Sequence, residues 1–211
     1  MSIDEAAGIP ANFFQRADES ADALFYIEPR FVTHIDDATI LALTDYYREF
    51  LPAGSDVLDL MSSWISHLPK EMEFNRISGL GMNEQELAGN PRLNDFQVHD
   101  LNVEPELPYP ASSFDRVLIA VSIQYLVRPL EVFSNVAQVL RNSGEVCIAM
   151  SHRLFPTKAI AAFQQLATAD RISLVQYYLQ QSGFVDIEFL DRSPANADPL
   201  WLVTGRSTKE T

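Results

Sequence analysis

Short apolar runs divide the chain, and stretches with helical spacing separate them. The runs predict buried strands over residues 57–60, 76–81, 96–100, 114–121 and 145–150, with two more near 185–190 and 200–205. Strands that alternate with helices indicate βαβ units and a mostly parallel sheet. The last two strands have no long crossover between them, which predicts an antiparallel edge. The sequence therefore predicts an α/β fold: a doubly wound, mostly parallel seven-stranded sheet with helices on both faces and an antiparallel C-terminal edge.

Polar residues mark the ends of the predicted helices. Asp37 precedes apolar residues at helical spacing and is expected to cap that helix. Asn83, with Glu86 three residues later, resembles a capping box. Gly144 is expected to terminate the helix that precedes the fifth strand.

The composition is that of a globular protein, with 47% hydrophobic and 21% charged residues. The 15 basic and 29 acidic side chains give a net charge of −14. Such a charge repels nucleic acids and anionic membranes, so we expect neither as a partner. No apolar run reaches the roughly 18 residues of a membrane helix, and the N-terminus lacks the plan of a signal peptide. A length of 211 residues favours one domain. A single Cys excludes an intramolecular disulfide and indicates a reducing compartment, so we expect the protein in the cytoplasm.

Ligands of doubly wound sheets bind beyond the carboxyl ends of the strands, where the strand order reverses. The residues to examine are therefore 59–64, 81–83, 100–102 and 120–125. Each acidic or amide side chain there also has a structural interpretation. Asp59 can cap the following turn, Asn83 can cap a helix, and Asp100 can accept in an Asx-turn.

Other chemistries find little support in the sequence. It contains no GxSxG elbow, no HExxH and no P-loop lysine pattern, which disfavours hydrolases and nucleotide phosphatases. His34 with Asp36 and Asp37 resembles a metal-ligand cluster, but a helix cap is the favoured interpretation of the two aspartates, and no metal is expected. Cys147 lies in a predicted strand, where a free thiol packs as a small apolar group.

One segment resembles a known family. Residues 107–110 (LPYP) followed by 112–118 (SSFDRVL) are similar to the "LPFP…SFDxV" passage of class I S-adenosylmethionine-dependent methyltransferases, of the type 11 kind. The passages 57–60 (VLDL), 99–102 (HDLN), 124–126 (QYL) and 139–150 (VLRNSGEVCIAM) agree with this resemblance. It covers roughly residues 55–150 and implies a Rossmann-like core, S-adenosyl-L-methionine as cofactor and methyl transfer to a small molecule.

The resemblance also implies roles for individual residues. Asp59 matches the acid near the cofactor's methionine amino group, and Asp100 matches the acid that accepts from the adenine amino group. Ala120 to Ser122 match the stretch that faces the transferred methyl group. The implied cofactor site consists of Asp59, Met61, Ser62, Ser63, Gly81, Met82, Asn83, Asp100, Leu101, Ala120 and Ser122.

Two departures from the family pattern concern this site. The family's glycine loop is replaced by residues 59–65 (DLMSSWI), and Pro69 interrupts the helix that would follow. Gly81 stands where the family has an acid for the ribose hydroxyls, which Asn83 replaces only in part. S-adenosylmethionine carries no phosphate, so serine hydroxyls and backbone N–H groups can hold it. A nicotinamide cofactor needs the missing glycines and is therefore disfavoured.

Residues 1–52 are expected to form an N-terminal arm and helix that act as a lid on the core of residues 53–211. The substrate candidates are Tyr26, His34, Tyr125, His152 and Arg153. Trp64 either stacks on a ligand or fills the space of the missing glycines. The alternative function, motivated by the lost glycines and ribose acid, is an inactive methyltransferase-like binding or scaffold protein. The sequence predicts neither the oligomeric state nor the substrate.

Overall fold

The computed structural model describes residues 8–208. Its strands are β1 (Asp56–Leu60), β2 (Arg76–Gly81), β3 (Asp95–Val98), β4 (Phe114–Ala120), β5 (Leu140–Met150), β6 (Phe184–Asp191) and β7 (Trp201–Ser207). Its α-helices are α2 (Asp22–Phe25), α3 (Asp37–Phe50), α4 (Glu84–Ala88), α5 (Pro129–Val139), α6 (Ala161–Gln165) and α7 (Thr168–Gln181). Two 3₁₀ turns, η1 (Ala11–Phe14) and η2 (Ile123–Tyr125), complete these elements.

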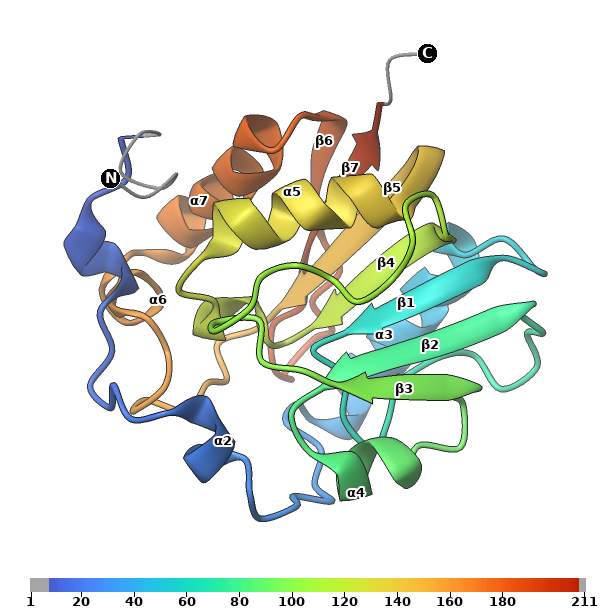
Figure 1. Ribbon diagram of the computed structural model, residues 1–211, viewed down its shortest axis with the longest axis horizontal. Coiled ribbons are helices and arrows are strands. Elements are labelled where there is room, and N and C mark those ends of the chain that lie inside the picture. The colour runs from blue at the N-terminus through green and yellow to red at the C-terminus, as the bar shows by residue number, and fades with distance from the viewer. Residues whose placement is uncertain (1–7, 209–211) are drawn as a thin grey trace.

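The strands form one sheet in the order β3-β2-β1-β4-β5-β7-β6 (Figure 1). The pairs among β1 to β5 are parallel, whereas β7 runs antiparallel to both β5 and β6. The predicted mostly parallel sheet with an antiparallel C-terminal edge is confirmed. The order reverses between β1 and β4, so the carboxyl ends of these strands are the expected ligand position.

Helices cover both faces of the sheet, as predicted. In Figure 1, α5 and α7 lie in front of the strands and α3 lies behind them. The front core includes Phe133 and Tyr178, and the rear core joins Leu43 and Tyr47 of α3 to strand residues that extend to Leu202. Most of the burial that stabilises the fold comes from these two apolar layers.

A pair of aspartates connects α3 to the loop before β7. The Asp36 N–H donates to Asp198 Oδ2 at 3.1 Å, and the Asp198 N–H donates to Asp36 Oδ2 at 2.6 Å. The Thr39 hydroxyl donates to the Asp198 carbonyl at 2.6 Å. The helix is therefore part of the packed core, and only the arm before it is left to cover the sheet edge.

Two predicted helix ends are wrong. Asp36, and not Asp37, caps α3, because its side chain accepts from the Thr39 N–H. The helix α5 ends at Val139 and β5 begins at the next residue, so Gly144 lies inside a strand. A register shift of the β4–β5 pair absorbs this early start of the strand.

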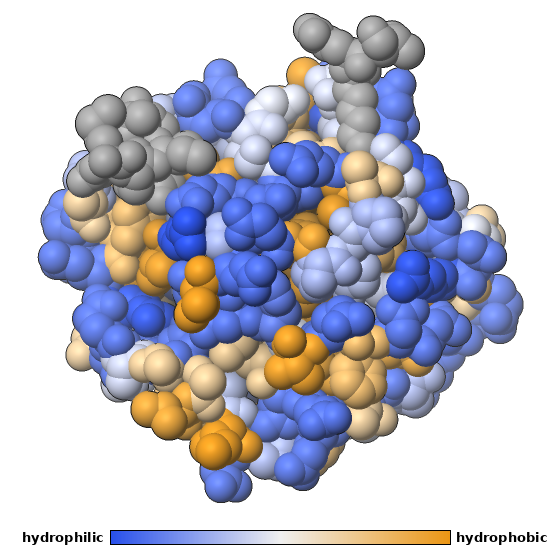
Figure 2. All heavy atoms as spheres, viewed as in Figure 1, coloured by the Kyte–Doolittle hydropathy of each residue, from blue (hydrophilic) through white to orange (hydrophobic). Residues whose placement is uncertain are grey.

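The connection from β1 to β2 contains no helix. Residues 61–75 run as turns and irregular backbone, as the interruption at Pro69 indicates. Among the described residues, no helix is long and apolar enough to cross a membrane. The face in Figure 2 is largely hydrophilic, with apolar areas between polar side chains.

Candidate functional site

A cavity of about 340 Å³ lies at the carboxyl ends of the parallel strands. This volume is in the range of small-molecule sites. Every residue expected at the cofactor lines it, and so do Tyr26, His34, Tyr125 and Arg153. His152 is not part of the lining, because its ring is turned to Asp198, with Nε2 3.0 Å from the carboxylate.

The loop after β1 is held together by side chains instead of being shaped by glycines. The hydroxyls of Ser62 and Ser66 both donate to Asp59 Oδ2 at 2.6 Å. Met61 takes the left-handed backbone with φ of 59°, and the Ser62 N–H donates to the Leu80 carbonyl at 2.8 Å. Burial raises the pKa of Asp59 to about 6 against the opposing effect of the serine hydroxyls. Asp59 is thus an internal anchor of this loop.

Gly81 leaves no room for a side chain. A Cβ atom at this position would lie 2.2 Å from the Ser62 carbonyl oxygen, which is a backbone atom. An acid at the end of β2 is therefore excluded by the path of the preceding loop. The two departures from the family pattern, at Gly81 and in the loop after β1, are therefore in direct contact.

The helix α4 begins with a half-formed capping box. Asn83 Oδ1 accepts from the Glu86 N–H at 3.0 Å, and Asn83 Nδ2 donates to the Tyr26 carbonyl at 2.8 Å. The Glu86 carboxylate does not return to Asn83. Its Oε1 accepts from the Arg30 N–H at 2.7 Å and its Oε2 from the Ser63 hydroxyl at 2.6 Å. Glu86 is buried and lines the cavity, a position that its capping-box spacing had concealed.

Asp100 follows β3, which ends two residues earlier than predicted, at Val98. The carboxylate accepts from the Asn102 N–H at 3.0 Å, so the expected Asx-turn is present. Leu101 is buried beside it. Asp100 itself remains partly exposed toward the cavity, which leaves its other acceptor positions available to a ligand.

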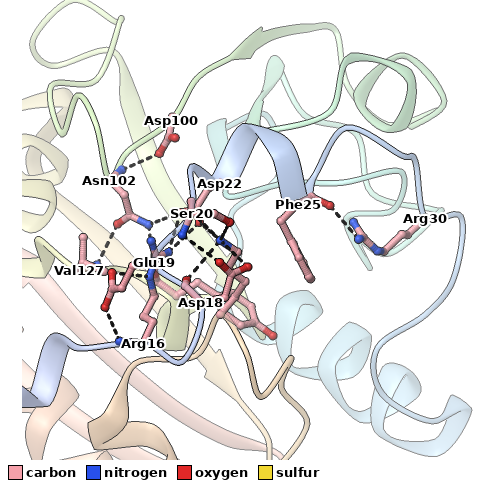
Figure 3. Close-up of polar contacts among 12 residues, drawn as sticks. Arg16, Asp18, Glu19, Ser20, Asp22, Phe25, Arg30, Asp100, Asn102 and Val127 are labelled. Atoms are coloured by element: carbon pink, nitrogen blue, oxygen red, sulfur yellow. Dashed lines mark hydrogen bonds and ion pairs between the residues drawn. The ribbon is translucent and has the colours of Figure 1, made fainter.

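A buried charge cluster ties the N-terminal arm to this turn (Figure 3). Asp22 accepts from Arg16 at 2.7 Å and from the Asn102 amide at 2.8 Å. The fully buried Lys158 lies 3.2 Å from Asp22 and 3.1 Å from Asp18. Hydrogen bonds from Ser20, and then from Lys158, lower the pKa of Asp18 to about 2. Sequence reasoning missed this cluster because its members are far apart along the chain.

Aromatic rings form another wall of the cavity. The Phe155 ring lies 5.3 Å from His34, 5.3 Å from Phe25 and 5.8 Å from Tyr125 between centroids. The Arg30 guanidinium lies 4.4 Å from the Phe25 centroid, a cation–π contact. The Tyr125 hydroxyl accepts from the Phe155 N–H at 2.8 Å. Burial raises the pKa values of Tyr26 and Tyr125, so both are neutral hydroxyls in this wall.

Two imidazoles face the cavity in neutral form. Burial lowers the pKa of His67 to about 4, and burial also lowers the pKa of His34. His67 takes the left-handed backbone with φ of 54°. Its Nδ1 is buried, and no group in the described part of the chain hydrogen-bonds it. A buried nitrogen of this kind is a ready acceptor or donor for a ligand or a water.

Trp64 does not line the cavity. Its Nε1 donates to the Val32 carbonyl at 3.0 Å, and its ring contacts Phe31 edge-on at 6.2 Å. It neither stacks in the cavity nor fills the place of the glycines. Its contacts instead fasten the arm to the loop after β1.

The cavity is lined by the carboxylates of Asp22, Asp59, Glu86 and Asp100. The guanidinium of Arg153 is paired with Asp198 at 3.0 Å, so Arg30 is the more available cation. Asp22 is neutralised by Arg16 and Lys158. Glu86 and Asp100, for which the described chain shows no ion pair, are therefore the carboxylates that favour a positively charged ligand over a phosphate. Among the described residues, no group of three or more His, Cys, Asp or Glu side chains is arranged to hold a metal ion.

Comparison with known proteins agrees with this geometry. A family model described as a methyltransferase domain matches residues 68–148. The resemblance to class I S-adenosylmethionine-dependent methyltransferases is confirmed. No curated protein sequence matches the chain.

Solved structures share the fold at low sequence identity. An S-adenosylmethionine-dependent methyltransferase from Mesorhizobium loti has 18% identity and a TM-score of 0.57, over 78% of this chain and 97% of that one. The [4+2]-cyclase SpnF has 17% identity and a TM-score of 0.60, over 80% and 81%. Phosphoethanolamine N-methyltransferase 2 from Haemonchus contortus, in complex with S-adenosyl-L-methionine, has 15% identity and a TM-score of 0.58, over 80% and 52%.

Proposed function

We propose that the protein is a cytoplasmic S-adenosylmethionine-dependent methyltransferase that acts on a small molecule. The observation that carries the proposal is the cavity at the reversal of strand order, which joins the Asp100 turn, the loop after β1 and the end of β4. These are the positions at which the family resemblance expects adenine, methionine and methyl group.

The chemistry of the lining fits the cofactor. Asp100, Leu101, Ser62 and Ser63 all line the cavity. The proposal assigns Asp100 and the Leu101 backbone to the adenine, and Ser62 and Ser63 to the methionine part. The Ser122 hydroxyl is buried without a hydrogen-bond partner in the described chain, so it is available to a bound group. When bound, the cofactor supplies an electrophilic methyl group on a positively charged sulfur. The carboxylates around the cavity stabilise that charge.

The chain's own residues then orient the acceptor and exclude water. Tyr26, Tyr125 and Phe155 give an apolar wall that packs a small substrate. The unprotonated His34 is the candidate proton acceptor for a hydroxyl or amine nucleophile, whereas a pKa of about 4 makes His67 a weak base. His152 does not line the cavity, so it is a weaker substrate candidate than the other four.

The arm segment 26–35 is proposed as the lid. Two side chains of the core donate hydrogen bonds to its backbone: Trp64 to the Val32 carbonyl and Asn83 to the Tyr26 carbonyl. Its own apolar side chains Ile27 and Phe31 are 66% and 52% exposed. Only Ile35, at the end of the segment, is packed in the rear core. The rest is fastened by a few hydrogen bonds and buries little apolar surface, so it opens at low cost.

A binding or scaffold protein is the alternative function. It is favoured by the Ser62 carbonyl against Gly81, which alters the ribose position of the pocket. The fold is also similar to that of SpnF, which is named a cyclase, so this fold is compatible with activities other than methyl transfer.

Titration calorimetry with S-adenosylhomocysteine tests the proposal, with NAD as control ligand. We expect a dissociation constant in the micromolar range, about −8 kcal/mol, and no heat with NAD. Absence of binding at millimolar S-adenosylhomocysteine would reject the enzyme and favour the scaffold. Binding of NAD instead would point to an oxidoreductase.

A further inference from the structure

The ribose of the proposed cofactor needs a hydrogen-bond acceptor that β2 does not provide. Gly81 is blocked, because any side chain there meets the Ser62 carbonyl oxygen at 2.2 Å. Asn83 is also committed, since its Oδ1 caps α4 and its Nδ2 is bound to the carbonyls of Tyr26 and Ile27. An acceptor for two neighbouring hydroxyls must therefore come from another carboxylate of the cavity.

Each of the other three carboxylates in the lining is either engaged by several groups of the chain or expected to face another part of the cofactor. Asp22 is surrounded by Arg16, Lys158 and Asn102. One oxygen of Asp59 accepts hydrogen bonds from two serine hydroxyls, and the residue is only 3% exposed. Asp100 belongs to the turn after β3, at the edge strand of the sheet, where the adenine is expected.

Glu86 is different because each of its oxygens is held by one fixed donor. The Arg30 N–H binds Oε1 at 2.7 Å and the Ser63 hydroxyl binds Oε2 at 2.6 Å. A carboxylate oxygen accepts two hydrogen bonds, so each oxygen keeps one free acceptor position. The two donors also fix the plane of the carboxylate, which pre-orients those positions for a ligand.

The position of Glu86 in the fold is consistent with a role in ligand binding. Glu86 is in the first turn of α4, which follows β2, and it lines the same cavity as Gly81 and Met82. The two oxygens of one carboxylate match the spacing of two adjacent hydroxyls, and such charge-assisted hydrogen bonds are the strong ones.

We propose that Glu86 accepts the hydrogen bonds of the two ribose hydroxyls, in place of an acid at the end of β2. The inference rests on the proposed cofactor. In this chain the loop after β1 lies against Gly81. The proposed acceptor is in α4, the helix that follows β2, and not at the end of the strand itself.

The test compares S-adenosylhomocysteine with its 2′,3′-dideoxy analogue by titration calorimetry. The wild-type protein is expected to bind the diol ligand about 10- to 100-fold more tightly than the analogue. Glu86→Gln should lose about 10- to 100-fold for S-adenosylhomocysteine and change less than about threefold for the analogue. Glu84→Gln removes an exposed charge from the same helical turn and should behave as wild type.

The outcomes separate this inference from the proposed function. Equal weakening of both ligands by Glu86→Gln would mean that Glu86 only holds the arm and the loop, and would overturn the inference. A wild-type protein that binds both ligands equally would overturn it as well, while leaving the cofactor in place. A wild-type protein that binds neither ligand would overturn both proposals.

Discussion

The side-chain amide of Asn102 donates a 2.8 Å hydrogen bond to the carboxylate of Asp22, although eighty positions separate the two residues. The same Asn102 provides the backbone N–H that fixes Asp100. The arm and the turn at the proposed adenine position are thus parts of one hydrogen-bonded unit. A substitution in the arm is therefore expected to shift the Asp100 turn, and a substitution in the turn to shift the arm.

Lys158→Met should destabilise the protein by about 1–3 kcal/mol, because it removes one of the two cations that pair with the buried Asp22 and also removes a hydrogen-bond donor from Asp18 and Ser20. Urea denaturation measures the change as a lower midpoint with an unchanged slope. Lys70→Met, at an exposed site, should change the free energy of unfolding by less than about 0.5 kcal/mol. A loss below 1 kcal/mol for Lys158→Met would show that Arg16 and Asn102 alone satisfy Asp22.

Asp100→Asn should weaken S-adenosylhomocysteine binding about tenfold or more. The asparagine oxygen can still accept from the Asn102 N–H, so the turn is kept while the charge is lost. Calorimetry measures the affinity, and thermal denaturation checks that the fold is intact. Glu106→Gln is an exposed control. An affinity within twofold of wild type would mean that the adenine does not lie against Asp100.

His67 should titrate near pH 4 in the folded protein, against about 6.5 in the unfolded chain. Between these values the unfolded chain binds more protons, so the free energy of unfolding falls as the pH falls from 6.5 to 4. His67→Asn, which tolerates the positive φ, should lose less stability over this range. Urea denaturation at pH 7 and pH 5 measures the difference.

Asp59 acts in the opposite direction over a similar range. Its pKa is raised to about 6, so the folded state holds the extra proton and stability falls as the pH rises from about 4 to 6. This effect is present in both proteins and cancels in the comparison of wild type with His67→Asn. Parallel pH profiles of the two proteins would contradict a buried neutral imidazole at position 67.

Gly81→Ala should cost about 2–3 kcal/mol, because the new methyl group meets the backbone oxygen of Ser62. Gly205→Ala is the milder comparison, since a Cβ there would lie 3.0 Å from Leu179 Cδ1 and 3.3 Å from Phe184 Cβ, and would meet no backbone atom at a shorter distance. Thermal denaturation of the two variants measures the contrast. Equal melting temperatures would mean that the loop after β1 shifts freely away from β2.

The sheet was predictable because its signals are local. Each buried strand is a short apolar run, and the switch from strand to helix spacing fixes the alternation. The ends of helices were predicted less well where two neighbouring residues can both act as the cap. Asp36 and Asp37 are equally good caps by type, and only the contact with Asp198 selects the first.

The site was predictable where a residue ends a strand, as for Asp59 and Asp100. The site was not predictable where the role of a side chain depends on hydrogen bonds to a segment far away in the sequence. Glu86 has the spacing of a capping box, and its partners Arg30 and Ser63 belong to other parts of the chain. Lys158 is an ordinary lysine in the sequence, and only the arm 140 positions earlier makes it a buried cation.

The packing of α3 against the strand next to the C-terminal edge sets a constraint on synthesis. The apolar side chains Leu43 and Tyr47 share a core with Leu200 and Leu202, and Asp36 is bonded to a residue 162 positions later. At about 5–20 residues per second, the ribosome needs roughly 8–30 s to deliver Leu202 after the end of the helix. During that interval α3 can pack only on the part of the rear core that is already synthesised, such as Val57 and Leu118. The rear core is therefore expected to be complete only when the last strand emerges.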